Sequence, residues 1–103
     1  MTITEEKLEN ILSSPEEAAR IADLIYVTDK HLTICRKKHG KGFTYCKNDK
    51  TIKSKTVLNR IKKLVIPPAW QDVLISEPAN GHLQAVGRDE KDRKVYLYHE
   101  TWN

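Results

Sequence analysis

The chain has 103 residues, 39% of them hydrophobic and 31% charged, which suits one domain with its own hydrophobic core. No apolar run is long enough to span a membrane, and the N-terminal Met-Thr-Ile-Thr-Glu-Glu lacks the basic and apolar regions of a signal peptide. Two cysteines are too few for a disulfide scaffold. We therefore expect a cytoplasmic protein without membrane contacts.

The charged residues are segregated along the chain. Residues 1–29 carry two bases and seven acids, a net charge of −5, and residues 64–103 carry four bases and six acids, a net charge of −2. Residues 30–63 carry twelve bases and one acid, a net charge of +11. A block this basic is typical of a surface that binds a polyanion such as nucleic acid. The alternative is a solvated basic face without a specific partner.

Helices are predicted at the N-terminal end. Ser14 precedes Pro15, and Glu17 follows three residues after the serine, which is the pattern of a capping box at a helix start. Apolar residues then recur at helical spacing: Ala18, Ile21, Ala22 and Ile25. A shorter, earlier helix is expected around Leu8, Ile11 and Leu12.

From Leu24 the pattern changes to short alternating segments, which predict strands. We expect them at Leu24–Thr28, Leu32–Lys37, Phe43–Lys47, Asp72–Ser76, His82–Val86 and Arg93–His99. The turn signal His39-Gly40-Lys41-Gly42 makes the second and third strands a hairpin. Because the loops between neighbouring strands are short, most pairs should be antiparallel.

One helix is expected between the strands. Ser54 is a suitable N-cap for a helix from Lys55 to about Leu64, and Pro67-Pro68 prevents its continuation. Its apolar stripe consists of Val57, Leu58, Ile61, Leu64 and Val65, and its basic residues Lys55, Arg60, Lys62 and Lys63 fall largely away from that stripe. The predicted fold class is α+β: a small antiparallel sheet of about five or six strands with N-terminal helices and one inserted helix.

The cysteines and histidines do not predict a catalytic or metal centre. A hairpin that turns at Gly40 and Lys41 places Cys35 and Cys46 opposite each other on one face, where we expect free thiols that fill the interior. A metal site built from His31, Cys35, His39 and Cys46 is disfavoured, because the spacing contains no CxxC or HxxxH pair that closes on another. The chain also lacks a nucleophile elbow and a phosphate-binding loop. We expect no catalytic residue, metal or cofactor.

The last predicted strand carries different chemistry on its two faces. Side chains alternate along a strand, so Lys94, Tyr96 and Tyr98 share one face. Arg93, Val95, Leu97 and His99 share the other, which has an apolar centre to bury. The first face offers a cation and two exposed phenols that suit contacts with bases, sugars or phosphates. The alternative is that a half-exposed strand generally favours Tyr and Lys on its solvent side.

Several motifs in this order resemble one family. They are Tyr26-Val27, Gly40-Lys41-Gly42-Phe43-x-Tyr45, Leu58-x-Arg60-Ile61, Ile66-Pro67-Pro68-Ala69-Trp70, Asn80-Gly81-His82-Leu83-Gln84-Ala85-x-Gly87-Arg88-Asp89 and Arg93-Lys94-x-Tyr96-x-Tyr98-His99. Together they cover about residues 24–103 and are similar to the N-terminal domain of bacterial type IB DNA topoisomerases, relatives of the poxvirus enzymes. Two positions depart from the family's pattern: Val95 stands where Gln is usual, and Asp92 where Gly is usual.

The resemblance implies a function and a division of labour. In that family the N-terminal domain is a small antiparallel sheet that holds one side of duplex DNA in the major groove. A separate C-terminal domain carries the catalytic Arg, Lys and His groups and the tyrosine that forms a 3′-phosphotyrosyl link, and supercoils relax without ATP or an obligatory metal. None of the four tyrosines here matches that nucleophile. We therefore expect a helical extension at residues 1–23 and a DNA-binding domain at residues 24–103, without the catalytic domain.

The expected partners are duplex DNA and the catalytic domain of the parent enzyme. The chain should act as a monomer, nucleoid-associated if the source is bacterial. The predicted DNA-contacting residues are Lys94, Tyr96, Tyr98, Arg93, Arg88, Arg36, Lys37, Lys38 and Lys41, of which the two tyrosines match those that the family presents to DNA. The basic residues of the hairpin and of the inserted helix cannot all face one duplex. We therefore expect the hairpin cations, rather than Arg60, Lys62 and Lys63, to contact DNA. The alternative function is a protein-interaction module that docks an acidic partner through the basic central segment.

Overall fold

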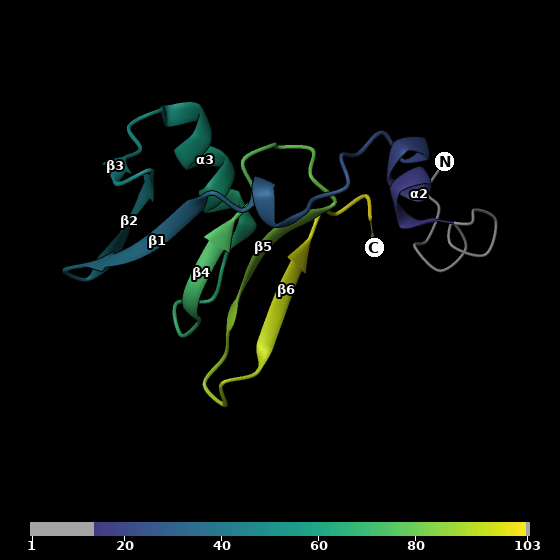
Figure 1. Ribbon diagram of the computed structural model, residues 1–103. Helices are drawn as coiled ribbons and strands as arrows, with labels where there is room; N and C mark the ends of the chain where they lie inside the picture. Colours follow the sequence, from purple (N-terminus) through teal and green to yellow (C-terminus); the bar gives the residue numbers. More distant parts are fainter. Residues whose placement is uncertain (1–13, 103) are drawn as a thin grey trace.

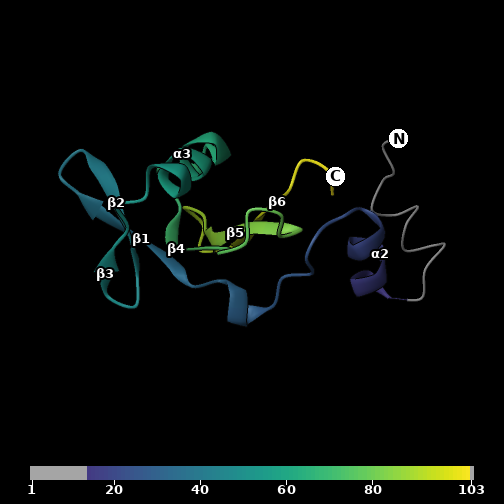
Figure 2. The same cartoon turned by 90° about the horizontal axis from the view of Figure 1, so that it is seen from above.

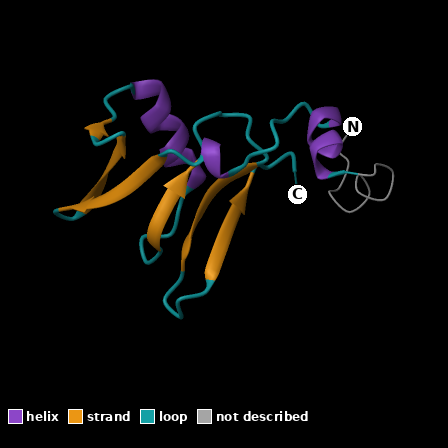
Figure 3. Ribbon diagram, in the orientation of Figure 1, coloured by secondary structure: helices purple, strands orange, loops and turns teal. Residues whose placement is uncertain are grey.

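The computed structural model describes residues 14–102 and contains one sheet with helices on either side and at one end (Figures 1 and 3). In chain order the elements are α2 (Pro15–Ile21), the 3₁₀ helix η1 (Asp29–His31), β1 (Ile34–His39), β2 (Gly42–Lys47), β3 (Lys50–Thr51), α3 (Lys55–Leu64), β4 (Gln71–Ile75), β5 (Leu83–Arg88) and β6 (Lys94–Tyr98). The six strands are ordered β3-β2-β1-β4-β5-β6, and each neighbouring pair is antiparallel. The predicted α+β class is confirmed. The helix expected around Leu8 lies outside the described residues.

Both described α-helices begin where their capping residues predict. The Ser14 hydroxyl accepts a hydrogen bond from the Glu17 amide at 3.3 Å, and the Ser54 hydroxyl accepts one from the Val57 amide at 3.4 Å. The end of α3 differs from the prediction. Val65 adopts a left-handed conformation with φ of 51° and is 79% exposed, so it does not belong to the apolar stripe. A left-handed C-cap turns the side chain away from the helix face just before the two prolines.

The β1–β2 hairpin follows the predicted geometry. Gly40 has a φ of 58°, and positive φ at the first of the two turn residues is the pattern of a type II′ turn. The register runs from His39 opposite Gly42 to Cys35 opposite Cys46. Both cysteines are free thiols; Cys46 is buried and Cys35 is half-buried. The predicted cross-strand pairing of the cysteines is confirmed.

The structure differs from the predicted strands in two places. The segment expected as a strand at Leu24–Thr28 forms only an isolated parallel bridge, between Ile25 and Gly81, because the strand it approaches already pairs with β4 and β6. Strand β3 was not predicted, since two exposed residues carry no alternation. It forms because Asn48 and Asp49 take φ values of 51° and 63°, the two successive positive values of a type I′ turn.

The main core lies between α3 and one face of the sheet. Its buried members are Ile34, Ile61, Ile66, Val73, Ile75 and Ala85. Leu97 of β6 packs against them, as the alternation predicts, whereas Val95 is only half-buried and lies outside the cluster. Figure 2 shows α3 on one side of the sheet and the segment that contains η1 on the other. No helix in the described part of the chain is long and apolar enough to cross a membrane.

A second, smaller core joins α2 to the residues that follow β6 at the end of the chain. Ala18 and Ala19 of α2 are buried together with Leu24 and Trp102. Next to them the His82 ring stacks on Tyr26 at 4.5 Å and meets the edge of Trp102 at 4.8 Å. The predicted boundary at residue 23 stays a prediction, but α2 and the end of the chain pack as one unit.

Candidate nucleic-acid interface

The ladder register identifies the side chains that share the sheet face opposite α3, which we call the open face. Cys46, Cys35, Leu74, Val86 and Tyr96 are successive cross-strand partners from β2 to β6 and therefore point to one side. The same side also carries three cations, each two residues from one of these partners in its own strand: Lys37 from Cys35, Arg88 from Val86 and Lys94 from Tyr96. The register thus brings together four of the predicted DNA-contacting residues, including Tyr96.

Tyr96 and Lys94 form the most accessible part of the open face. Tyr96 is 47% exposed, and the Lys94 ammonium lies 5.5 Å from the centre of its ring. The Tyr98 ring stacks beside that of Tyr96, with 6.2 Å between the centroids. An exposed phenol next to a cation offers a surface for a base or sugar, a hydroxyl for hydrogen bonding and a positive charge for phosphate.

Tyr98 is less available than the alternation predicts. It is half-buried and packs against the second core, with its ring centroid 6.2 Å from that of His82. The strand pattern gives the face of Tyr98 correctly, but the second core covers part of this side chain. Tyr98 therefore supports the fold as well as bordering the candidate interface.

A groove of about 310 Å³ lies between η1 and the open face. Its lining residues come from η1 and the segment after it, and from β4, β5 and β6: Asp29, Leu32, Asp72, Leu74, Val86, Gly87, Arg88 and Lys94. Two acids thus accompany the two bases. Sequence reasoning missed Asp29 and Leu32, because only tertiary packing brings the segment around η1 across the sheet. It also missed Asp72, which lies on β4.

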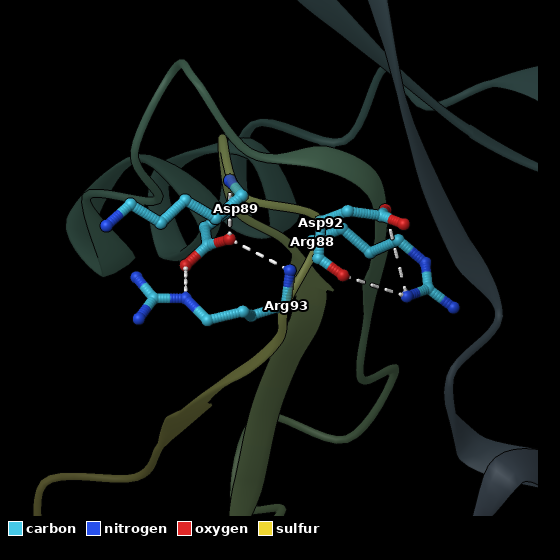
Figure 4. A network of polar contacts seen from close by, with 5 residues as sticks. Arg88, Asp89, Asp92 and Arg93 are labelled. Carbon is cyan, nitrogen blue, oxygen red and sulfur yellow. Dashed lines mark hydrogen bonds and ion pairs between the residues drawn. The ribbon is translucent and has the colours of Figure 1, made fainter.

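The turn between β5 and β6 is held by Asp89 (Figure 4). One oxygen of its carboxylate accepts hydrogen bonds from the amides of Arg93 at 2.9 Å and Lys91 at 3.0 Å, and the other accepts one from the Arg93 Nε at 2.7 Å. The hydrogen bond from the Arg93 amide is the main cause that lowers the pKa of Asp89. Arg93 thus has a local carboxylate partner.

Arg88 lies beside the second aspartate of the same turn. Its guanidinium is 3.9 Å from the Asp92 carboxylate and donates to the Asp92 carbonyl at 3.4 Å (Figure 4). Asp92 itself has a φ of 59°, in the left-handed region that glycine adopts without a steric penalty. Exposed pairs of this kind are worth about 1 kcal/mol or less, so phosphate can compete for Arg88.

Arg36 serves the fold rather than the open face. Its guanidinium donates to the carbonyls of Trp70 at 2.8 Å, Pro67 at 3.1 Å and Ile66 at 3.4 Å, and it lies 4.1 Å from the centre of the Phe43 ring. Desolvation lowers the pKa of Arg36. Its donors thus tie the hairpin to the loop after α3, on the side opposite the predicted interface.

The hairpin lysines differ in direction. Lys37 lies on the open face, Lys38 on the other face beside Trp70, and Lys41 at the exposed turn. None of the three forms an ion pair with any residue that the structure describes. Lys47, further along the hairpin, pairs with Glu77, and that contact is the main cause that lowers the pKa of Glu77.

The cations of α3 are separated from the open face by the sheet itself. Arg60 donates to the Ser76 carbonyl at 2.8 Å and to the Gln84 side chain at 3.1 Å, so it anchors α3 to the sheet. Burial lowers the pKa of Arg60. Lys62 and Lys63 are exposed in the last turn of the helix. Lys37 and the cations of α3 therefore lie on opposite sides of the sheet.

The described residues contain no group of three or more His, Cys, Asp or Glu side chains that could hold a metal ion. Of the four residues considered above for such a site, only Cys35 and Cys46 are cross-strand partners. His31, for example, accepts a hydrogen bond from the Thr28 amide at 2.9 Å in the capping of η1.

Comparison with known proteins agrees with the motifs. Residues 42–89, which include β2 to β5 and α3, match the family described as bacterial DNA topoisomerase IB, N-terminal domain. A relative from Acanthamoeba polyphaga mimivirus, described as DNA topoisomerase 1B, is 42% identical over 76 residues. That match covers 70% of this chain but only 22% of the relative. The chain belongs to the family of N-terminal domains found in bacterial and viral type IB DNA topoisomerases.

Proposed function

We propose that this domain binds duplex DNA and positions it for strand cleavage and rejoining by a separate catalytic domain of a type IB topoisomerase. The observation that carries the proposal is the gathering of Arg88, Lys94 and Tyr96 on the open face, with Lys37 on the same side of the sheet. The family membership supports it independently.

The shape of the domain suits the major groove of DNA, which admits a two-stranded β-ribbon. The β1–β2 hairpin is such a ribbon and presents Lys37 and Lys41 without intramolecular ion pairs among the described residues. In this arrangement the lysines neutralise phosphates, and Tyr96 contacts a base edge or sugar. Val95 points away from the open face, so sequence readout at this strand falls to Tyr96 and its neighbours rather than to residue 95.

The wider setting follows from the same proposal. The parent protein is an ATP-independent isomerase whose catalytic groups lie in another domain, and the present residues contribute binding and orientation. The partners are duplex DNA and that catalytic domain, and the protein acts as a monomer in the cytoplasm, on the nucleoid in a bacterium.

A second candidate is a module that docks an acidic protein. It is favoured by Lys62 and Lys63, which are exposed on α3, on the far side of the sheet from the open face. The salt dependence of DNA binding tests the first candidate directly, because phosphate contacts release condensed counterions.

A DNA titration of the full chain over a range of salt concentrations tests the proposal. With roughly three to five phosphates neutralised, log affinity should fall against log salt with a slope of about −3 to −4.5. The Lys94→Ala/Tyr96→Ala variant should bind more weakly than the wild type, whereas the matched Lys62→Ala/Lys63→Ala variant should retain more of the affinity. A slope near zero, or a larger loss from the α3 variant, would contradict the proposal.

A further inference from the structure

The proposed DNA-binding role makes no use of the two thiols that face each other in the β1–β2 hairpin. Cys35 and Cys46 are direct partners in the ladder, and both are free. Directly opposite residues of an antiparallel pair have Cα atoms about 4.5 to 5.5 Å apart. A disulfide spans Cα distances of roughly 4.4 to 6.8 Å. The two cysteines are therefore close enough to be joined without any change of register.

The two thiols differ in access to solvent. Cys46 is only 8% exposed, whereas Cys35 is half-buried on the same face. A reagent in solution should therefore reach Cys35 first. Cys46 is then the neighbouring thiol that can complete the reaction from the adjacent strand.

We propose that Cys35 and Cys46 form a reversible intramolecular disulfide when the chain meets a low-molecular-weight disulfide such as oxidised glutathione. The Cys35 thiolate attacks one sulfur of glutathione disulfide, forms a mixed disulfide and releases one glutathione thiolate. The Cys46 thiolate then attacks the Cys35 sulfur and releases the second glutathione. Both protein thiols lose their protons to the medium and are oxidised, and one glutathione disulfide is reduced to two glutathione molecules.

The geometry favours a bond that is easily reduced again. The Cβ atoms of directly opposite residues lie about 4.5 to 5.5 Å apart, whereas a relaxed disulfide needs about 3.5 to 4.5 Å. Closing the bond must draw β1 and β2 together, and Cys35 is also held in register with Leu74 of β4. Strain of this kind raises the reduction potential of a disulfide, so the bond should form at a high oxidised fraction and be readily reduced again.

The test uses the native full chain without DNA, so its outcome is independent of the proposed function. The protein is equilibrated in glutathione buffers of increasing oxidised fraction, and the free thiols are then trapped with N-ethylmaleimide and the products weighed by mass spectrometry. The expected product is a monomer that has lost two hydrogen atoms, with Cys35 and Cys46 in one cross-linked peptide pair. Excess reduced glutathione should reverse it.

Single-cysteine variants provide the matched controls. Cys46→Ser should stop at the mixed disulfide on Cys35, and Cys35→Ser should react more slowly with glutathione because the remaining thiol is buried. The proposal would be overturned if the wild type also stopped at a mixed disulfide. Covalent dimers in place of the internal bond would overturn it equally.

Discussion

The two faces of the sheet are formed by the same strands but use their cations differently. On the face covered by α3, Arg36 and Arg60 donate to main-chain carbonyls of the neighbouring loops. On the open face, Lys37 and Lys94 form no ion pair with the described residues, and Arg88 has only a weak one. The difference shows that a basic sequence block is not a measure of a binding surface, because part of its charge is engaged in holding the fold.

The largest expected difference between the faces is in stability. Ile75 is fully buried in the core under α3, so Ile75→Ala should lower the free energy of unfolding by about 2 to 5 kcal/mol. Tyr96→Ala, on the open face, should cost about 0.5 kcal/mol or somewhat more. In DNA titrations of the folded variants, Tyr96→Ala should lose more DNA affinity than Ile75→Ala. Denaturant unfolding and DNA binding of both variants measure this, and a stability loss from Tyr96→Ala equal to that of Ile75→Ala would show that the faces are assigned wrongly.

The alternation of residues predicts these faces well, because period two is a local property of a strand. Lys94 and Tyr96 are exposed and Leu97 packs on the core, as the pattern indicates. What covers a face is a long-range property. The packing of α2 near Tyr98, and of η1 across Leu74 and Val86, depends on contacts between distant segments.

The roles of individual cations were also beyond the sequence. An arginine that donates to loop carbonyls, such as Arg36, cannot be told from the sequence apart from an arginine in solvent.

Strand β3, in contrast, could have been predicted, since Asn48-Asp49 is a pair that favours a type I′ turn. The structural role of Asp89 was likewise hidden, because solvated acids are the usual occupants of an exposed turn.

The second expected effect separates the two tyrosines of β6. Tyr98 packs against the second core, so Tyr98→Ala should lower the free energy of unfolding by about 1 to 3 kcal/mol. Tyr98→Phe keeps the ring and should retain most of the stability. Thermal unfolding of these variants beside Tyr96→Ala provides the measurement. Equal stability losses from Tyr96→Ala and Tyr98→Ala would mean that Tyr98 belongs to the open face alone.

The third effect is a pH dependence located in the second core. Burial lowers the pKa of His82 below its usual 6.5, and its ring nitrogen accepts a hydrogen bond from the Val27 amide at 2.8 Å. The unfolded chain binds a proton at His82 more readily than the folded one. The free energy of unfolding should therefore be unaffected by this group above about pH 6.5 and should fall as the pH drops below that value.

The rings packed around His82 are those of Tyr26, Tyr98 and Trp102, so His82 is the only histidine among them. His82→Gln should flatten the pH profile of unfolding between about pH 5 and 7, at some cost in overall stability. His39→Gln, at the exposed end of β1, is the matched control and should leave the profile unchanged. A profile that persists in His82→Gln would place the titrating group elsewhere.

The smallest effect concerns the turn that borders the open face. Asp92 occupies a left-handed conformation, so Asp92→Gly should relieve the backbone and change the free energy of unfolding by about 0.5 to 1 kcal/mol in the stabilising direction. It also removes the carboxylate beside Arg88 and should strengthen DNA binding severalfold at low salt. Asp92→Asn separates these two causes, because asparagine tolerates the left-handed region and carries no charge. If the charge is what weakens binding, Asp92→Asn and Asp92→Gly should gain DNA affinity equally while only the glycine variant gains much stability. An affinity gain confined to Asp92→Gly would instead assign the effect to the shape of the turn and leave Arg88 without a role in phosphate contact.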